Sequence, residues 1–172
     1  YNEETDQIVF SSPNLSEIYM IDHGTTTKQA AGHKGGRGGK GGDFLYRWGN
    51  PKNYQRGDST NQKIFGQHDV RWIQKGLPGA GHLTLFNNDI RGKDSLNYSM
   101  IFEIAPPVND KGNYYLESNH TYGPDKPVLT YMAPTTLSFY ASFISGAQRM
   151  EDGGTFRKEG PTEHFFEVKR LV

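Results

Sequence analysis

Cysteine is absent from the 172 residues of this sequence. Its absence excludes disulfides, thiolate catalysis and cysteine-bound zinc, but it fits an oxidising and a reducing compartment equally well. Net charge is absent too, since 19 Lys and Arg balance 19 Asp and Glu, and nothing global favours nucleic acid or an anionic membrane as a partner. No apolar run approaches the roughly 18 residues of a membrane helix, so we expect no membrane span.

Local spacing for a metal site is also missing. Neither H-x-x-x-H nor H-E-x-x-H occurs in the sequence. We therefore expect no metal site from the scattered histidines His23, His33, His82, His120 and His164.

Residues 36–41 formally match the dinucleotide-binding pattern G-x-G-x-x-G. That motif needs a strand before it and a helix after it, so that the helix N-terminus can hold the pyrophosphate. Here a glycine-rich stretch comes before and a strand-like pattern comes after, so we expect no dinucleotide and no other cofactor. A solvated loop is the first interpretation, and a basic loop that meets an anionic ligand is the alternative.

Glycine and aromatic residues are abundant, with 21 Gly, ten Tyr, ten Phe and two Trp. No stretch of ten or more residues has a convincing helical period, and residues 25–31 allow one helical turn at most. The sequence therefore predicts an all-β protein, with a hairpin turn at 151–154. The predicted strands lie at 8–12, 17–22, 43–48, 70–73, 83–87, 100–104, 128–132, 139–145, 148–150, 155–158 and 165–169.

Three segments look alike, each with a short polar or glycine-bearing entry that leads into an alternating strand. They begin at Gln7, Gln67 and Ser145. A repeated unit of short strands cannot bury its faces alone, so it stacks on its neighbours. The pattern predicts a partial β-propeller over residues 1–172, with about three four-stranded blades at 1–50, 64–133 and 139–172 and a glycine-rich loop at 31–42.

A closed propeller has about four to eight blades. We therefore expect either further chain or a partner chain to complete the ring. The sequence also opens inside a strand-like pattern, so we expect it to be a piece of a longer protein.

His68 is the sharpest candidate for chemistry, because an imidazole can accept or donate a proton near neutrality or attack through a ring nitrogen. Asp69 is its neighbour, but adjacent residues of a strand point to opposite faces, so we expect no direct pair. Arg91 carries a guanidinium fork that suits a sulfate or phosphate group. A structural histidine and an ordinary hairpin arginine are the alternatives. Asn88, Trp72 and Gln148 are candidate substrate-binding residues.

Three N-glycosylation patterns begin at Asn14, Asn97 and Asn119. They favour a secreted glycoprotein, although coincidence in a chain that contains many Ser and Thr residues is the alternative.

Several longer blocks resemble the arylsulfotransferase family, and most of all its uncharacterised secreted branch. The most specific are Gly-Asp-Phe-Leu-Tyr-Arg-Trp-Gly-Asn-Pro at 42–51 and Phe-Gly-Gln-His-Asp at 65–69. The blocks at 76–83, 85–88 and 143–150 extend the similarity over most of the chain.

The resemblance implies a six-bladed propeller in a secreted or periplasmic protein, with a site in the central channel. It implies transfer of a sulfuryl group from an aryl sulfate to a phenol without a nucleotide donor, with His68 and Arg91 at the sulfate. The attacking histidine of the family is expected on a later inner strand, where this chain has Ser-Gly-Ala-Gln at 145–148. A non-catalytic secreted propeller that binds a protein or glycan partner is therefore the alternative.

Overall fold

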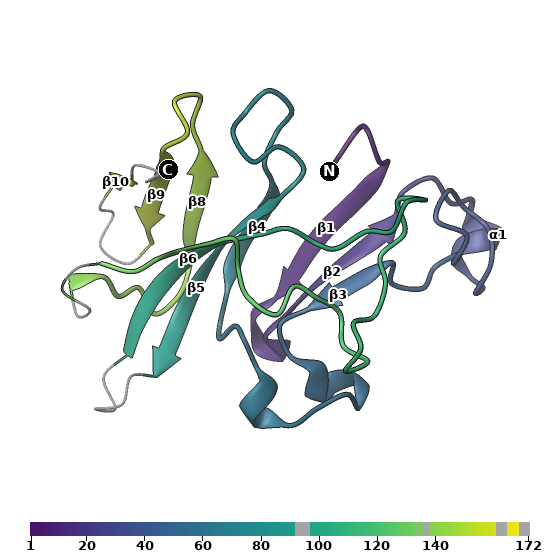
Figure 1. Ribbon diagram of the computed structural model, residues 1–172, viewed down its shortest axis with the longest axis horizontal. Helices are drawn as coiled ribbons and strands as arrows, with labels where there is room; N and C mark the ends of the chain where they lie inside the picture. The colour runs from purple at the N-terminus through teal and green to yellow at the C-terminus, as the bar shows by residue number, and fades with distance from the viewer. Residues whose placement is uncertain (92–96, 134, 136–137, 161–164, 169–172) are drawn as a thin grey trace.

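Antiparallel strands make up most of the regular structure in the computed structural model, which describes residues 1–91, 97–133, 135, 138–160 and 165–168. Within these residues ten strands form three sheets, and the one α-helix, α1 (Thr27–Ala30), is a single turn. Figure 1 shows the three sheets following one another across the molecule. The prediction of a β protein with at most one helical turn near residue 28 is confirmed.

The first sheet has the order β1-β2-β3 and consists of β1 (Gln7–Ser12), β2 (Glu17–Asp22) and β3 (Tyr46–Trp48). β1 and β2 pair along their whole length, because a tight turn ending at Ser16 in the left-handed conformation reverses the chain. Between β2 and β3 the chain runs out through α1 and the glycine-rich segment, at the right-hand end of Figure 1. Three short 3-10 turns complete this part of the chain: η1 (Pro13–Leu15), η2 (Pro51–Tyr54) and η3 (Ser59–Asn61).

The second sheet has the order β4-β5-β6-β7. Its ladder shifts register twice, between His68 and Arg71 on β4 and between Asn87 and Ile90 on β5. Such bulges re-aim side chains and often lie beside functional sites. β7 pairs with β6 at the outer edge, which confirms the predicted fourth strand. The strands are β4 (His68–Trp72), β5 (Leu83–Arg91), β6 (Asn97–Ile104) and β7 (Leu129–Tyr131).

The third sheet has β9 in its centre and consists of β8 (Ser145–Arg149), β9 (Thr155–Glu159) and β10 (Phe165–Val168). The predicted hairpin joins β8 to β9, because the Met150 amide donates to the Gly154 carbonyl and Gly153 takes a positive φ of 86°. Only glycine adopts that backbone conformation without strain.

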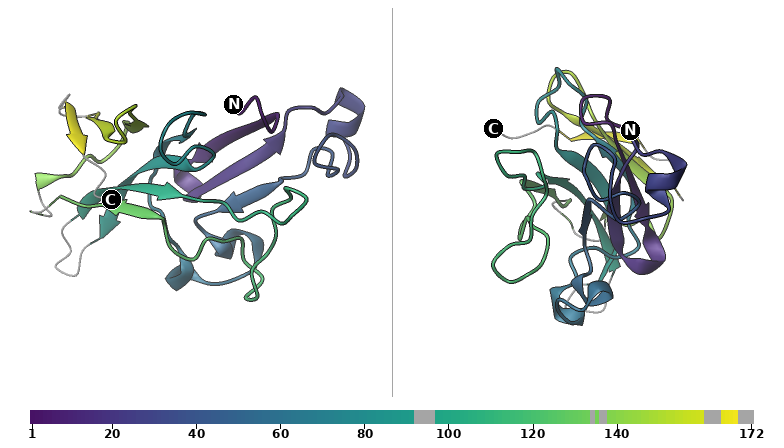
Figure 2. Two further views of the ribbon diagram at one scale, coloured as in Figure 1. Left: turned by 45° about the horizontal axis from the view of Figure 1, so that its top comes forward. Right: turned by 90° about the vertical axis from the view of Figure 1, so that its right-hand side faces the viewer.

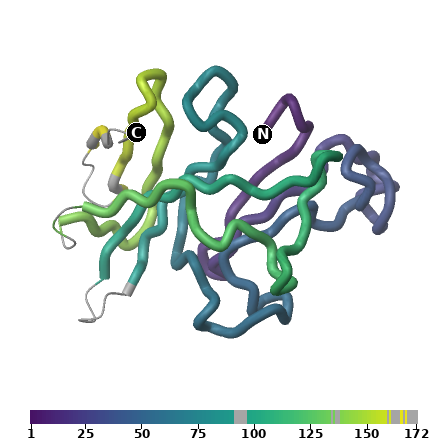
Figure 3. The backbone as a smooth tube through the Cα atoms, viewed as in Figure 1, coloured from purple at the N-terminus to yellow at the C-terminus, as the bar shows by residue number. Residues whose placement is uncertain are grey.

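The first strands of the three sheets lie next to one another. β1 contacts β4, and β8 contacts both β4 and β5. Figure 2 shows this order of sheets from two further directions, and the tube in Figure 3 follows the chain from the first sheet through the second to the third.

Two apolar cores fill the spaces between the sheets. The larger one joins the first two sheets, and its fully buried side chains include Trp48, Tyr46, Met20, Leu83 and Ile104. The smaller one joins the second and third sheets around Phe86, Ile101, Phe139 and Ala147. Each large apolar side chain buried in this way contributes about 1.5–3 kcal/mol relative to its exposed state. These two shared cores explain why the sheets stack on one another.

Buried polar groups also tie the sheets together. The amide nitrogen of Gln67 donates to the carbonyls of Ser12 and Glu17, at 3.1 and 3.0 Å. Glu103 on β6 forms an ion pair with Arg149 on β8, and both side chains are 1% exposed. These contacts hold β4 against the first sheet and β8 against the second.

Two strand predictions need correction. Of the predicted strand 43–48 only Tyr46–Trp48 pairs, because its partner β2 ends the ladder at Met20. Of the predicted strand 139–145 only Ser145 belongs to a strand. Polar side chains from the second sheet occupy the backbone groups of that segment instead: the Ala141 amide donates to Ser99 Oγ, and the Ala141 carbonyl accepts from Asn88 Nδ2.

The four-strand blade is found once, since the described residues give three strands to the first and third sheets and four to the second. Within the described ranges the three sheets do not close into a ring. No helix among these residues is long and apolar enough to cross a membrane.

Candidate functional site

A cavity of about 480 Å³ opens where β4 meets β8 and β9. Its cationic side chains are Arg71 and Lys158, and His68 contributes an imidazole. Ile144 and Phe156 add apolar surface. The remaining lining comes from Asp69 and from Ser145, Gly146, Ala147 and Gln148 on β8. The cavity therefore combines positive charge with an aromatic surface.

His68 is held by Asn88, the residue at the bulge of the neighbouring strand β5. The Nδ1 atom of His68 lies 2.9 Å from Asn88 Oδ1. Asn88 is fully buried, and its amide nitrogen donates to the Ala141 carbonyl at 2.8 Å. A carbonyl can only accept a hydrogen bond, so this contact fixes which end of the Asn88 amide faces the imidazole.

The orientation of Asn88 decides the tautomer of His68. Because an amide oxygen faces Nδ1, the neutral ring carries its proton on Nδ1 and leaves the lone pair on Nε2. Nε2 has no hydrogen-bond partner among the residues that the structure describes. The ring thus offers the cavity a nitrogen that can take a proton or attack an electrophile.

Asp69 and Arg71 form an ion pair at the mouth of the same cavity. The second carboxylate oxygen of Asp69 accepts from the Ala147 amide at 3.1 Å, which links β4 to β8. Asp69 has a φ of +54°, a left-handed conformation that aspartate tolerates better than most residues. His68 and Asp69 make separate hydrogen bonds, as expected, but the bulge breaks the strand alternation and brings both to one cavity.

The other predicted site residues are divided between the cavity and other places. Gln148 lines the cavity, where its side-chain oxygen accepts from Arg71 at 3.4 Å. Asn88 does not line the cavity but orients His68, which does. Trp72 is 6% exposed in the core between the first two sheets and is not among the residues that line this cavity. Arg91 is the last residue of β5, and its side chain lies outside the described part of the structure.

Eight of the ten residues that line the cavity were not predicted as site residues, and four of these eight carry a charge or an aromatic ring: Asp69, Arg71, Phe156 and Lys158. Asp69 and Arg71 stand beside the predicted His68, but the bulge that turns them inward has no clear sequence signal. Phe156 and Lys158 sit two residues apart on β9, so the period of a strand places them on one face. That signal could have shown that the pair shares a surface, although not that this surface borders β4.

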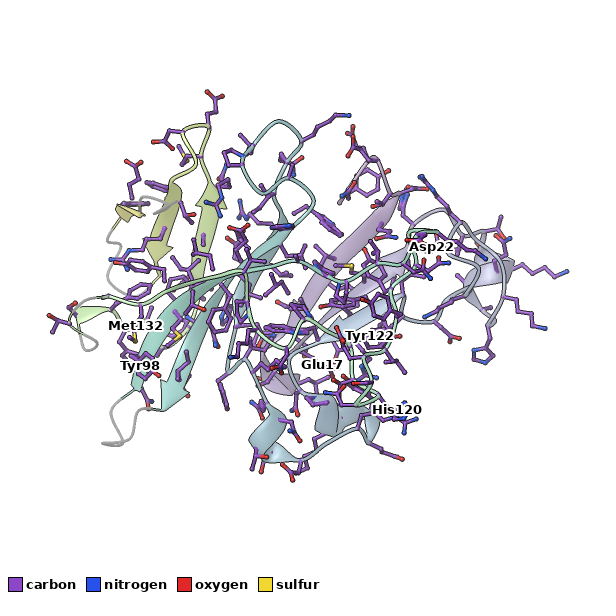
Figure 4. All side chains as sticks on the ribbon, viewed as in Figure 1. Glu17, Asp22, Tyr98, His120, Tyr122 and Met132 are labelled. Atoms are coloured by element: carbon purple, nitrogen blue, oxygen red, sulfur yellow. The ribbon has the colours of Figure 1, made fainter. Side chains whose placement is uncertain are left out.

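The glycine-rich segment is organised around a carboxylate of its own chain. Asp22, at the end of β2 and labelled in Figure 4, accepts hydrogen bonds from the amides of Gly24 and Gly38. A side chain at Gly36 would collide with this carboxylate, since its Cβ would lie 2.5 Å from Asp22 Oδ2. Within the G-x-G-x-x-G match, the Gly38 amide thus binds Asp22 and the Gly41 amide binds the Gly35 carbonyl, and this geometry does not support a phosphate site.

No group of three or more His, Cys, Asp or Glu side chains among the described residues could hold a metal ion. The cavity between β4 and β8 brings basic, aromatic and titratable groups together around one open space. Comparison with protein-family models, with curated proteins and with solved structures finds no match for this chain.

Proposed function

We propose that the cavity between β4 and β8 binds an aryl sulfate and transfers its sulfuryl group to a phenol, with His68 as the base. The observation that carries the proposal is the buried Asn88 amide, which holds the Nδ1 side of His68 at 2.9 Å and leaves Nε2 with its lone pair. A positioned base of this kind contributes to proton transfer in the transition state.

The reaction needs no nucleotide. Nε2 of His68 takes the proton of the acceptor phenol, and the phenolate oxygen attacks the sulfur. The bond between sulfur and the donor oxygen breaks, and the donor phenolate leaves with the proton returned from Nε2. One aryl sulfate and one phenol thus give one phenol and one aryl sulfate.

The other lining groups suit the two ends of such a substrate. Lys158 would attract the sulfate and the charge that develops on the leaving oxygen. The ring of Phe156 is 38% exposed and would stack on the phenol. Arg91 stays a predicted member of the sulfate site.

Turnover of 4-methylumbelliferyl sulfate with phenol as acceptor, followed by fluorescence, tests this function. We expect His68→Ala to lower kcat at least about a hundredfold, in line with the loss of a general base. His33→Ala is the matched control, because His33 is exposed in the glycine-rich loop and away from the cavity. Activity of His68→Ala equal to that of the wild type would remove His68 from the mechanism.

The finer architecture belongs to the same proposal: the three sheets are consecutive blades of a propeller. The adjacency of β1, β4 and β8 supports this, because the innermost strands of neighbouring blades meet around the axis. Further blades or a partner chain would complete the ring, and we propose a secreted or periplasmic location. The test of the ring is the number of blades in a crystal structure of the protein assembled with whatever completes it.

A non-catalytic binding module is the second candidate. Exposed apolar side chains around the third sheet favour it, namely Phe143 at 51%, Ile144 at 62% and Phe165 at 56% exposure. Such a surface fits a protein or glycan partner. Wild-type protein that binds aryl sulfate without any turnover would favour this second function.

A further inference from the structure

We propose that Asp69 sets the charge selectivity of the cavity, so that the site accepts monoanionic aryl esters and rejects dianionic ones. This inference rests on the proposed aryl sulfate site. It concerns a residue that binds no proton in the reaction and that sequence reasoning did not assign.

Both oxygens of the Asp69 carboxylate are engaged. Oδ1 accepts from the guanidinium of Arg71, including a 3.1 Å bond from Nε, and Oδ2 accepts from the Ala147 amide at 3.1 Å. Gly146 makes room for this arrangement, because a Cβ there would lie 2.5 Å from Oδ2. The carboxylate is thus held in place beside Arg71 by both strands of the cavity.

The charge balance of the cavity follows from this pair. Asp69 cancels the charge of Arg71, and His68 in its neutral form adds none. Lys158 forms no ion pair with the carboxylates that the structure describes, so the lining carries one positive charge. A sulfate monoester brings one negative charge and matches it. A phosphate monoester above pH 7 brings two negative charges. The second charge would have no positive partner in the cavity, so its loss of water beside the Asp69 carboxylate would weaken binding.

Equilibrium binding at pH 8 tests the inference without any need for turnover. The two probes are 4-methylumbelliferyl sulfate, a monoanion, and 4-methylumbelliferyl phosphate, a dianion, each titrated into the wild-type protein. We expect the sulfate to bind at least about tenfold more tightly than the phosphate. Equal affinity, tighter binding of the phosphate, or binding of neither probe would overturn the inference.

Asp69→Asn is the decisive variant, because asparagine tolerates a positive φ and keeps one hydrogen bond to β8. The variant removes the carboxylate that compensates Arg71, so the cavity gains one net positive charge. At about 5 Å in a water-like dielectric, one added positive charge raises the binding affinity of a monoanion about fourfold and that of a dianion about fifteenfold. The preference for sulfate should therefore shrink about fourfold. A cooperative thermal unfolding transition confirms that the variant is folded.

The double variant Asp69→Asn, Arg71→Gln removes both charges and restores the wild-type balance. We expect the double variant to recover most of the wild-type preference for sulfate over phosphate. If Asp69 had a purely structural role, the second substitution would weaken binding further and would not restore that preference. Unchanged selectivity in Asp69→Asn, or no recovery in the double variant, would contradict the inference. Selective binding without turnover would refute the proposed catalysis and leave the role of Asp69 intact.

Discussion

Asn88→Ala is the substitution that bears most directly on how the site is built. Asn88 is fully buried, and its side chain makes two short hydrogen bonds, to the Ala141 carbonyl at 2.8 Å and to His68 at 2.9 Å. The first bond fixes the segment before β8 against the second sheet, and the second bond orients the imidazole. Their loss should therefore affect both stability and the site.

The magnitude follows from what each partner keeps. The buried Ala141 carbonyl loses its shortest hydrogen bond and keeps only a long one from Ser99 Oγ at 3.4 Å. The loss of most of its hydrogen bonding costs about 1–3 kcal/mol. His68 is half-buried and can turn to water, so its lost bond costs only about 0.5–1.5 kcal/mol. The free energy of unfolding should thus fall by about 3 kcal/mol.

Urea denaturation of the wild type, Asn88→Ala and Asn113→Ala measures this. Asn113 is exposed, and its side chain makes no hydrogen bond to the residues that the structure describes, so its truncation should change the free energy of unfolding by less than about 0.5 kcal/mol. If the Asn88 variant lost no more than the Asn113 control, the bond network around His68 would not exist as described.

Three further outcomes follow from the structure. Glu103→Gln should lower the free energy of unfolding by about 3–5 kcal/mol in urea, because it leaves the buried guanidinium of Arg149 facing a neutral amide. Burial raises the pKa of Tyr19 to about 12, so the folded state keeps a proton that the unfolded state releases near pH 10. The free energy of unfolding should therefore fall as pH rises from about 10 to 12, and it should fall less steeply in Tyr19→Phe. Urea denaturation midpoints across this pH range measure the effect, and equal slopes for the two proteins would contradict it. Gly146→Ala should cost about 1–3 kcal/mol in thermal unfolding, since its Cβ would meet Asp69, and a neutral result would mean that the carboxylate moves freely.

Much of the secondary structure could be predicted from the sequence because turn residues and alternation agree. β2 has the predicted bounds, since Pro13 and the polar residues around it form a turn just before the alternating run. The hairpin at Gly153 was predicted for the same reason. The segment 139–145 is also rich in aromatic and apolar residues, but Ser99 and Asn88 form hydrogen bonds with its backbone groups. No pattern in the sequence indicates that these side chains would compete with strand pairing.

The site was only partly predictable, because its geometry depends on bulges and on contacts between sheets. His68 could be named from its chemistry and Asn88 from its place in the chain, but their 2.9 Å contact requires two bulged strands in register. Strand alternation predicts that Asp69 lies on the face opposite His68, but the bulge interrupts the alternation and brings both residues to the same cavity. Trp72 looked suited to a ligand, but burial of its ring in the core outweighs that role.

The state of the His68 ring is the most direct test of the account. A two-bond proton–nitrogen NMR spectrum of ¹⁵N-histidine-labelled protein, recorded at a pH where the imidazole is neutral, reports which ring nitrogen carries the proton. We predict that Nδ1 is protonated and that the Nε2 signal moves when 4-methylumbelliferyl sulfate is added. A proton on Nε2, or an Nε2 signal indifferent to the ester, would contradict the assignment of His68 as the base of an aryl sulfate site.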